Sequence, residues 1–172
     1  DIYWNSFNDP QLTKSIISKY SSYSNHCYDK IISKRDFDNY EYKVAFAGIR
    51  GHRYNGNPSW DWTTLLDEDK MKNFKKTAND KEDMYAFPFN TENECKNFVK
   101  YVNSDIFEYM ILVQKNSMNT DKWLFKKIPY LPTYTKEWSE EDIAKEFSLT
   151  KEELDYIHDE MKDFGWKTRN KR

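Results

Sequence analysis

Residues 136–157, KEWSEEDIAKEFSLTKEELDYI, contain two well-marked helix starts. Ser139 stands three residues before Asp142, and Thr150 stands three residues before Glu153, which is the spacing of a capping box. In such a box the hydroxyl and the carboxylate bind free backbone N–H groups at the start of the helix. Apolar residues recur at three- and four-residue spacing and form one stripe on each helix: Ile143, Phe147, Leu154, Ile157, Met161 and Phe164. The pattern predicts two short C-terminal helices that pack on the upstream chain.

The upstream chain has signals for both helices and strands. Asp9 followed by Pro10 is a favourable opening, and it predicts a helix in the segment that ends at Tyr20. Residues 91–114 begin with a further capping-box pair, Thr91 and Glu94, and continue with a broad apolar face, which predicts the longest helix. Runs of aromatic and β-branched residues predict strands at 40–49, 83–89 and 123–128.

This order of elements predicts an α+β fold in a single domain, residues 1–172. We expect a small mixed or antiparallel sheet packed on the long helix, followed by the two short C-terminal helices. Residues 1–89 would hold the first helix, the strands and a glycine-rich basic loop at 47–62. Residues 90–172 would hold the long helix, a further strand and the C-terminal helical pair.

The composition predicts a core built from aromatic side chains. The mean hydropathy is -1.03, yet the chain has six Trp, 13 Tyr and 11 Phe residues, each of which buries a large area. No apolar run approaches the roughly 18 residues of a membrane span and no secretion signal opens the chain, so we expect a soluble, cytoplasmic protein without a membrane partner. Because the sequence begins at Asp1 rather than Met, we expect a piece cut from a longer protein, or a protein whose first residues were left out. Cys27 and Cys95 are expected to be free thiols.

The charges are distributed unevenly along a chain whose net charge is -2. Residues 42–60 contain three basic residues and no acidic one, and residues 109–136 contain five lysines against one aspartate. Residues 137–160 contain ten carboxylates and two lysines. Basic middle segments and an acidic tail allow an anionic partner for the middle of the chain, whereas the alternative interpretation is a set of solvated faces.

The segment AGIRGHRYNGNPSWDW, residues 47–62, holds three of the four glycines of the protein. Glycine lets a backbone approach a ligand closely, and Arg and Asn side chains can bind base edges with two hydrogen bonds. The segment therefore predicts a loop that reads DNA, although an ordinary long turn is the alternative. The candidate loop residues are Arg50, His52, Arg53, Tyr54, Asn55 and Asn57. The candidate phosphate-binding residues are Lys115, Lys122, Lys126 and Lys127.

Patterns typical of catalysis are weak in this sequence. NPSW at 57–60 approaches the Asn-Pro-Pro-aromatic signature of amino-methyltransferases, but serine replaces the second proline and no glycine-rich turn could hold S-adenosylmethionine. EYK at 41–43, with Asp29 or Asp36 upstream, has the form of a metal-dependent nuclease strand, a form that is common by chance in a chain with 33% charged residues. DEDK at 67–70 fits a solvated turn. We therefore predict no catalytic residue, no metal ligand and no cofactor in this chain.

Residues 83–160 resemble the C-terminal part of adenine-specific DNA methyltransferases of bacterial and phage restriction-modification systems, including those fused to a nuclease. NFVKYVNSDIFEYMI at 97–111 matches a long helix of that family, and IPYLPTYTKEW follows at 128–138. FSLTKEELDYI at 147–157 matches the family pattern Phe/Tyr-x-Leu-Thr-x-Glu-Glu-Ile-x-x-Ile. In the family this region belongs to, or closes off, the target-recognition part.

The resemblance implies a non-catalytic DNA target-recognition domain of, or derived from, such an enzyme. Its partners would be double-stranded DNA and a methyltransferase catalytic domain, and S-adenosylmethionine would be the cofactor of the parent enzyme only. Two alternatives stay open. The chain could be a protein-interaction module, acting as a subunit or decoy that binds a methyltransferase or another protein, or it could be a metal-dependent nuclease.

Overall fold

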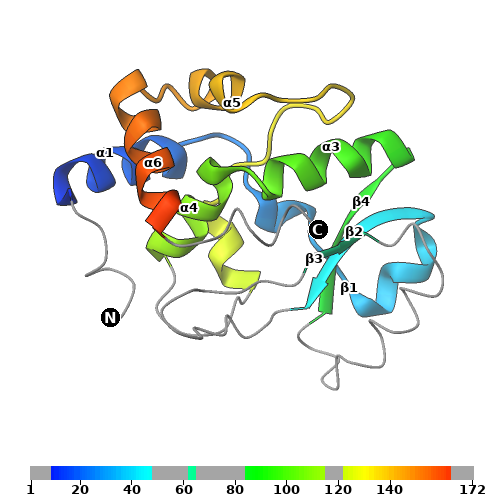
Figure 1. The fold of residues 1–172 in the computed structure, drawn as a ribbon. Coiled ribbons are helices and arrows are strands. Elements are labelled where there is room, and N and C mark those ends of the chain that lie inside the picture. The colour runs from blue at the N-terminus through cyan, green and yellow to red at the C-terminus, as the bar shows by residue number, and fades with distance from the viewer. Residues whose placement is uncertain (1–8, 48–61, 65–83, 115–121, 164–172) are drawn as a thin grey trace.

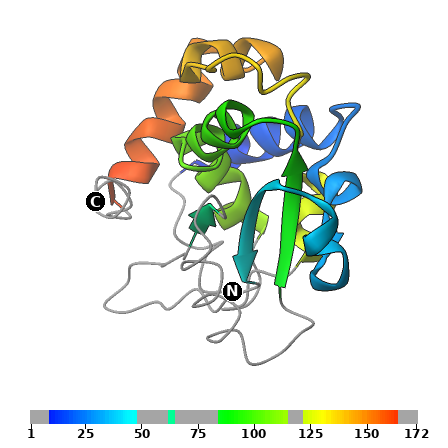
Figure 2. The ribbon, with the colours of Figure 1, turned by 90° about the vertical axis from the view of Figure 1, so that its right-hand side faces the viewer.

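The computed structural model describes residues 9–47, 62–64, 84–114 and 122–163, and these form an α+β fold, as predicted. Figure 1 shows the sheet on one side of the molecule and most of the helices gathered on the other. In the view of Figure 2 some helices lie above the central strands of the sheet and others lie beside them.

The sheet is antiparallel and has the strand order β1-β4-β2-β3. Its strands are β1 (Ile32–Ser33), β2 (Tyr42–Ala47), β3 (Trp62–Thr64) and β4 (Met84–Phe89). The central pair aligns Val44 with Phe87 and Ala45 with Ala86, and all four residues are buried. Pro88 of β4 lies opposite Lys43 of β2, beyond the two residues of β4 that pair with β1. The predicted strands at 40–49 and 83–89 are thus confirmed where the structure describes them.

The first helix, α1 (Pro10–Ser21), begins as predicted. The Asp9 side chain accepts hydrogen bonds from the backbone N–H groups of Gln11 and Leu12, and Pro10 occupies the first turn. Two 3-10 helices follow, η2 (Cys27–Lys30) and η3 (Lys34–Asn39).

The prediction of one continuous helix at 91–114 is wrong, because this segment forms two helices, α3 (Glu92–Val102) and α4 (Asp105–Gln114). Ser104 breaks it: its hydroxyl donates to the carbonyl of Tyr101 and accepts from the backbone N–H of Phe107. A serine that binds local backbone groups in this way favours a helix boundary over a helix interior. The capping box of Thr91 and Glu94 at the start of α3 is present.

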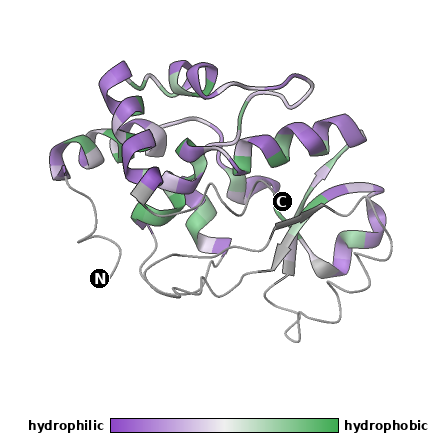
Figure 3. Cartoon of the chain, viewed as in Figure 1, coloured by the Kyte–Doolittle hydropathy of each residue, from purple (hydrophilic) through white to green (hydrophobic). Residues whose placement is uncertain are grey.

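The two helices have different environments. α3 packs against β2 and β4, where the ring of Phe98 lies 4.7 Å from that of Phe87. Every residue of α4 from Asp105 to Val113 is buried, including the carboxylates Asp105 and Glu108. Figure 3 shows hydrophobic residues on much of this helix. Its apolar residues suit a position in the interior.

The predicted strand at 123–128 is also wrong, because residues Lys122–Lys127 form the 3-10 helix η4. Phe125 and Ile128 are both buried, and the N–H of Ile128 binds the carbonyl of Phe125. A 3-10 helix places residues i and i+3 on the same face, so these two side chains enter the core while Lys126 and Lys127 stay in water. An extended strand would have placed Phe125 and Lys127 on the same face.

The two short C-terminal helices are confirmed as α5 (Glu140–Glu146) and α6 (Lys151–Asp163). The Ser139 hydroxyl accepts from the N–H of Asp142, and Thr150 and Glu153 form a complete reciprocal box. The predicted stripe is buried at every described position, namely Ile143, Phe147, Leu154, Ile157 and Met161. Phe164 lies outside the described residues. Within the described part of the chain, no helix has the length and apolar character to cross a membrane.

Candidate nucleic-acid interface

Three of the predicted DNA contacts lie in the described part of the chain, and all three belong to η4. Lys122, Lys126 and Lys127 are exposed. The other predicted contacts lie outside the described residues: Arg50, His52, Arg53, Tyr54, Asn55, Asn57 and Lys115.

Backbone hydrogen bonds hold η2 beside η4. Figure 2 shows η4 in yellow next to η2 in blue, on the right of the sheet. The N–H of Cys27 donates to the carbonyl of Ile128 over 2.8 Å, and the N–H of Tyr130 donates to the carbonyl of Asn25 over 3.0 Å. The Cys27 thiol also donates to the carbonyl of Pro129 over 3.3 Å. Two segments about a hundred residues apart in sequence are therefore fixed against each other.

This pairing produces a stack of two rings and one ammonium group. The rings of Tyr28 and Trp123 are stacked, with centroids 5.7 Å apart and planes inclined by 22°. The ammonium of Lys126 lies 3.9 Å from the centroid of the Trp123 ring and 5.1 Å from that of Tyr28. These distances are within the range of a cation–π interaction, which extends to roughly 6 Å.

The Trp123 side of the stack is exposed to solvent, and the two 3-10 helices that carry the stack also carry exposed lysines. Trp123 is 55% exposed, which is unusual for so large an apolar side chain. Lys30 of η2 is exposed and its ammonium lies 5.5 Å from the ring of Tyr130. We name this region the η2–η4 surface, and define it by the following residues: Tyr28, Lys30, Lys122, Trp123, Lys126 and Lys127. Asp29 is the acidic residue of η2, so the surface has a positive balance.

Sequence reasoning missed the aromatic part of this surface. Trp123 lies between Lys122 and Lys126 in the sequence KWLFKK, and an aromatic residue among lysines is a signal for nucleic-acid binding that could have identified it. Tyr28 and Lys30 had no such signal, because only the fold brings η2 to η4.

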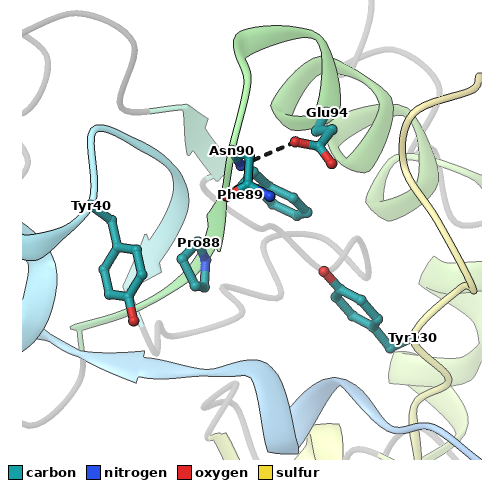
Figure 4. A pocket seen from close by; sticks show the side chains of 6 residues that line it. All are labelled: Tyr40, Pro88, Phe89, Asn90, Glu94 and Tyr130. Carbon is teal, nitrogen blue, oxygen red and sulfur yellow. Dashed lines mark hydrogen bonds between the residues drawn. The ribbon is translucent and has the colours of Figure 1, made fainter.

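A pocket of about 220 Å³ lies between η3, the end of β4 and the segment after η4. Figure 4 shows Tyr40 and Tyr130 on opposite sides of it, with Pro88 and Phe89 between them. The Glu94 carboxylate at its rim is engaged, because it accepts from the N–H groups of Asn90 and Thr91. The pocket is smaller than the roughly 300–1,000 Å³ of typical small-molecule sites, so we do not assign a cofactor to it.

The candidate nuclease strand is not assembled as a metal site. The buried ammonium of Lys43 donates to the backbone carbonyl of Tyr40, while Glu41 is exposed. Among the described residues, the group whose donor atoms lie close enough to share a metal ion consists of Asp105, Glu140 and His158, and includes none of Asp29, Asp36 and Glu41. Sequence reasoning missed this group, whose members lie on three separate helices without a local motif.

The two thiols are not candidate nucleophiles. Cys27 and Cys95 are free and buried. Burial raises the pKa of the Cys27 thiol well above its usual value. Burial, reinforced by the carboxylates of Glu94 and Glu92, raises the pKa of Cys95 to about 12. Both thiols are therefore protonated at neutral pH, and the reactive form of cysteine is the thiolate.

Comparisons of the chain with models of protein families, with curated proteins and with solved structures give no match.

Proposed function

We propose that the chain is a non-catalytic DNA target-recognition domain of, or derived from, a restriction-modification adenine DNA methyltransferase, and that its η2–η4 surface binds the DNA backbone. The observation that supports this proposal most directly is the exposed stack of Lys126, Trp123 and Tyr28. The class comes from the resemblance of residues 83–160 to the C-terminal part of such enzymes, which belongs to, or closes off, their target-recognition part.

The chemistry of the surface suits a polyanion. Four exposed lysines, Lys30, Lys122, Lys126 and Lys127, lie on two adjacent 3-10 helices. Each ammonium that neutralises a phosphate releases a condensed counterion, which is the main source of sequence-independent affinity for DNA. The Trp123 ring holds the Lys126 ammonium close to the surface and offers an aromatic face to any unpaired base.

Base reading belongs to a different part of the proposed domain. We assign it to the loop at 47–62, and to Arg50, Arg53, Asn55 and Asn57 in particular. Arginine and asparagine are residue types that can form paired hydrogen bonds to base edges, whereas lysines bind phosphate as point charges.

The proposal is tested by the salt dependence of DNA binding. A fluorescently labelled duplex would be titrated with the protein at several salt concentrations, and the slope of log K against log [salt] would be measured by anisotropy. Lys126→Ala should make the slope shallower by about one unit, because one fewer counterion is released. Lys122→Ala and Lys127→Ala should each have the same effect.

Lys136 provides a matched control. Its ammonium lies 3.9 Å from the ring of Trp138, the same separation as that between Lys126 and Trp123, but it lies in the loop between η4 and α5. Lys136→Ala should leave the slope unchanged. Equal slopes for the wild type, Lys126→Ala and Lys136→Ala would contradict the assignment of the η2–η4 surface.

A protein-interaction module is the second candidate function. Its support is the 55% exposure of Trp123, because tryptophan is enriched among the residues that dominate binding at protein interfaces. Binding to DNA that is weak and independent of salt, together with tight binding to a methyltransferase catalytic domain that Trp123→Ala abolishes, would favour this function over the first.

A further inference from the structure

Three helices bring a histidine and two carboxylates together outside the η2–η4 surface. Asp105 is the first residue of α4, Glu140 is the first residue of α5, and His158 lies within α6. One oxygen of each carboxylate and one nitrogen of His158 all lie within 4.8 Å of one another. The Nδ1 atom of His158 is 2.7 Å from Oδ2 of Asp105 and 3.3 Å from Oε2 of Glu140.

A backbone hydrogen bond orients the carboxylate of Glu140. Its Oε1 atom accepts a hydrogen bond from the backbone N–H of Ile106 over 3.2 Å, and this contact directs Oε2 to His158. Fixing one oxygen of a carboxylate by a hydrogen bond while the other faces the metal is a common arrangement around metal ions in proteins. The Asp105 side chain is only 7% exposed, whereas those of Glu140 and His158 are each 27% exposed, so an ion and its water have access from solvent.

The group holds two carboxylates close together, because one oxygen of Asp105 lies within 4.8 Å of one oxygen of Glu140. Like charges at this separation repel each other. A divalent cation bound between the two carboxylates would offset this repulsion.

We propose that Asp105, Glu140 and His158 form a binding site for a divalent transition-metal ion, zinc above all, which fastens α6 to the first turns of α4 and α5. The site is independent of the proposed DNA-binding function.

The two contacts of His158 need to change little to accept the ion. Bonds of about 2.1 Å in a tetrahedral arrangement place two ligand atoms about 3.4 Å apart. The contact between His158 and Glu140 has nearly this length, and the contact between His158 and Asp105 must lengthen by less than about 1 Å. Zinc would bind Nδ1 of the neutral imidazole, whose one ring proton would then be on Nε2, and water would complete the coordination of the ion.

The donor set selects the class of metal. One imidazole nitrogen with two carboxylate oxygens suits zinc and its neighbours in the first transition series. Magnesium and calcium prefer sites made only of oxygen ligands. Cys27 and Cys95 are buried in the core and do not compete for the ion in the folded protein.

Binding is tested on the whole chain after treatment with a chelator. Isothermal titration with zinc chloride should give one site per chain with a Kd in the micromolar range or below, and magnesium chloride should give no binding at this site. At a zinc concentration 100 times the Kd, the unfolding temperature should rise by about 5–10 °C, because the ion binds only the folded state.

Two variants locate the ion, and a third is the control. Asp105→Asn and His158→Gln should each weaken zinc binding at least about 10-fold, because each removes one of three ligands. His26→Gln should bind zinc as the wild type does, because His26 lies in the segment before η2 and its ring contacts the carbonyl of Ser21.

A measurement on the wild type keeps the proposal testable if a variant does not fold. The imidazole signals of His158 and His26 would be followed by NMR during the zinc titration. The signals of His158 should shift to saturation at one equivalent of zinc, while those of His26 stay in place. No saturable binding, unchanged affinity in both ligand variants, or an unshifted His158 signal would each overturn the proposal.

Discussion

The Glu153 carboxylate connects the N-terminal helix to the C-terminal one. It accepts hydrogen bonds from the Lys19 ammonium and the Ser15 hydroxyl of α1, and from the backbone N–H of Thr150 at the start of α6. Glu153 is only 2% exposed. Burial acts to raise the pKa of this carboxyl, but the bonds from Lys19 and Thr150 outweigh burial and lower it below its ordinary value. The ionised form is therefore the one that stabilises the fold.

This shift gives stability a defined pH dependence at one residue. A carboxyl whose pKa is lower in the folded state stabilises the fold above its unfolded pKa, about 4.3, and this contribution is lost as the pH falls through the folded pKa. Glu153→Gln should cost about 1–3 kcal/mol at pH 7 and much less near pH 3. Urea unfolding of the wild type and the variant at both pH values is the measurement. Glu152→Gln, at the exposed neighbouring position, is the control. An equal cost at both pH values would contradict the prediction.

Ser148 has an unfavourable backbone conformation, because its φ is 59° and it carries a side chain. The hydrogen bonds from the N–H of Leu149 to the carbonyl of Ala144 and from Ser148 to Lys145 form the Schellman end of α5. Glycine is the residue that this position usually contains. Ser148→Gly should therefore raise the free energy of unfolding by about 0.5–1 kcal/mol, as measured by denaturant titration. Thr150→Gly, at the cap of α6, should instead lower it, which provides the control for a general effect of glycine.

The C-terminal helices depend for their stability on their apolar stripes. Phe147 ends α5 with its ring 5.1 Å from that of Tyr23, and Ile157 is completely buried on α6. Phe147→Ala and Ile157→Ala should each lower the free energy of unfolding by about 2–5 kcal/mol, through lost burial and a residual cavity. Lys145→Ala, on the exposed side of α5, should change it by less than about 0.5 kcal/mol. If the two core variants unfold like Lys145→Ala, the stripes are not part of the core.

Among the elements, those with local signals could be predicted from the sequence. The starts of α1, α3, α5 and α6 each have a capping side chain within four residues of the backbone group that it binds. Residues 122–127 have no such signal, and their aromatic residues fit a strand as well as a 3-10 helix. The tertiary positions of Phe125 and Ile128 decide between the two. The end of α5 was equally hidden, because serine occupies the position where glycine would have marked it.

At the scale of the whole molecule, the lysines of the η2–η4 surface could be predicted from the sequence, whereas the stacking of its aromatic residues could not. Lys122, Lys126 and Lys127 are neighbours in sequence, so an excess of lysines identified them. Tyr28 reaches Trp123 only through backbone hydrogen bonds between η2 and the segment after η4, and such bonds leave no trace in side-chain identity. The group of Asp105, Glu140 and His158 was hidden for the same reason, since the packing of α4, α5 and α6 creates it.

On the scale of the whole domain, we propose that two basic regions have different roles in DNA binding, namely the η2–η4 surface and the segment 47–62. Lysines of the η2–η4 surface would bind phosphate. Removing one of them would weaken binding to all DNA sequences alike. Arg50 and Arg53 would instead read bases, and an arginine with two hydrogen bonds to guanine contributes about 1–3 kcal/mol of discrimination at one position. Arg50→Ala or Arg53→Ala should therefore relax the preferred sequence at a single base position, whereas Lys126→Ala should preserve it.

Selection of bound duplexes from a random pool tests this division directly. The wild type, both arginine variants and Lys126→Ala would be selected at the same salt concentration, because affinities at different salt are not comparable. We expect the wild type and Lys126→Ala to enrich one motif, with the lysine variant recovering less DNA in total. Each arginine variant should enrich the same motif with one position degenerate. Should both arginine variants enrich an unaltered motif with equal stringency, the loop at 47–62 is a structural turn and base reading must lie elsewhere in the chain.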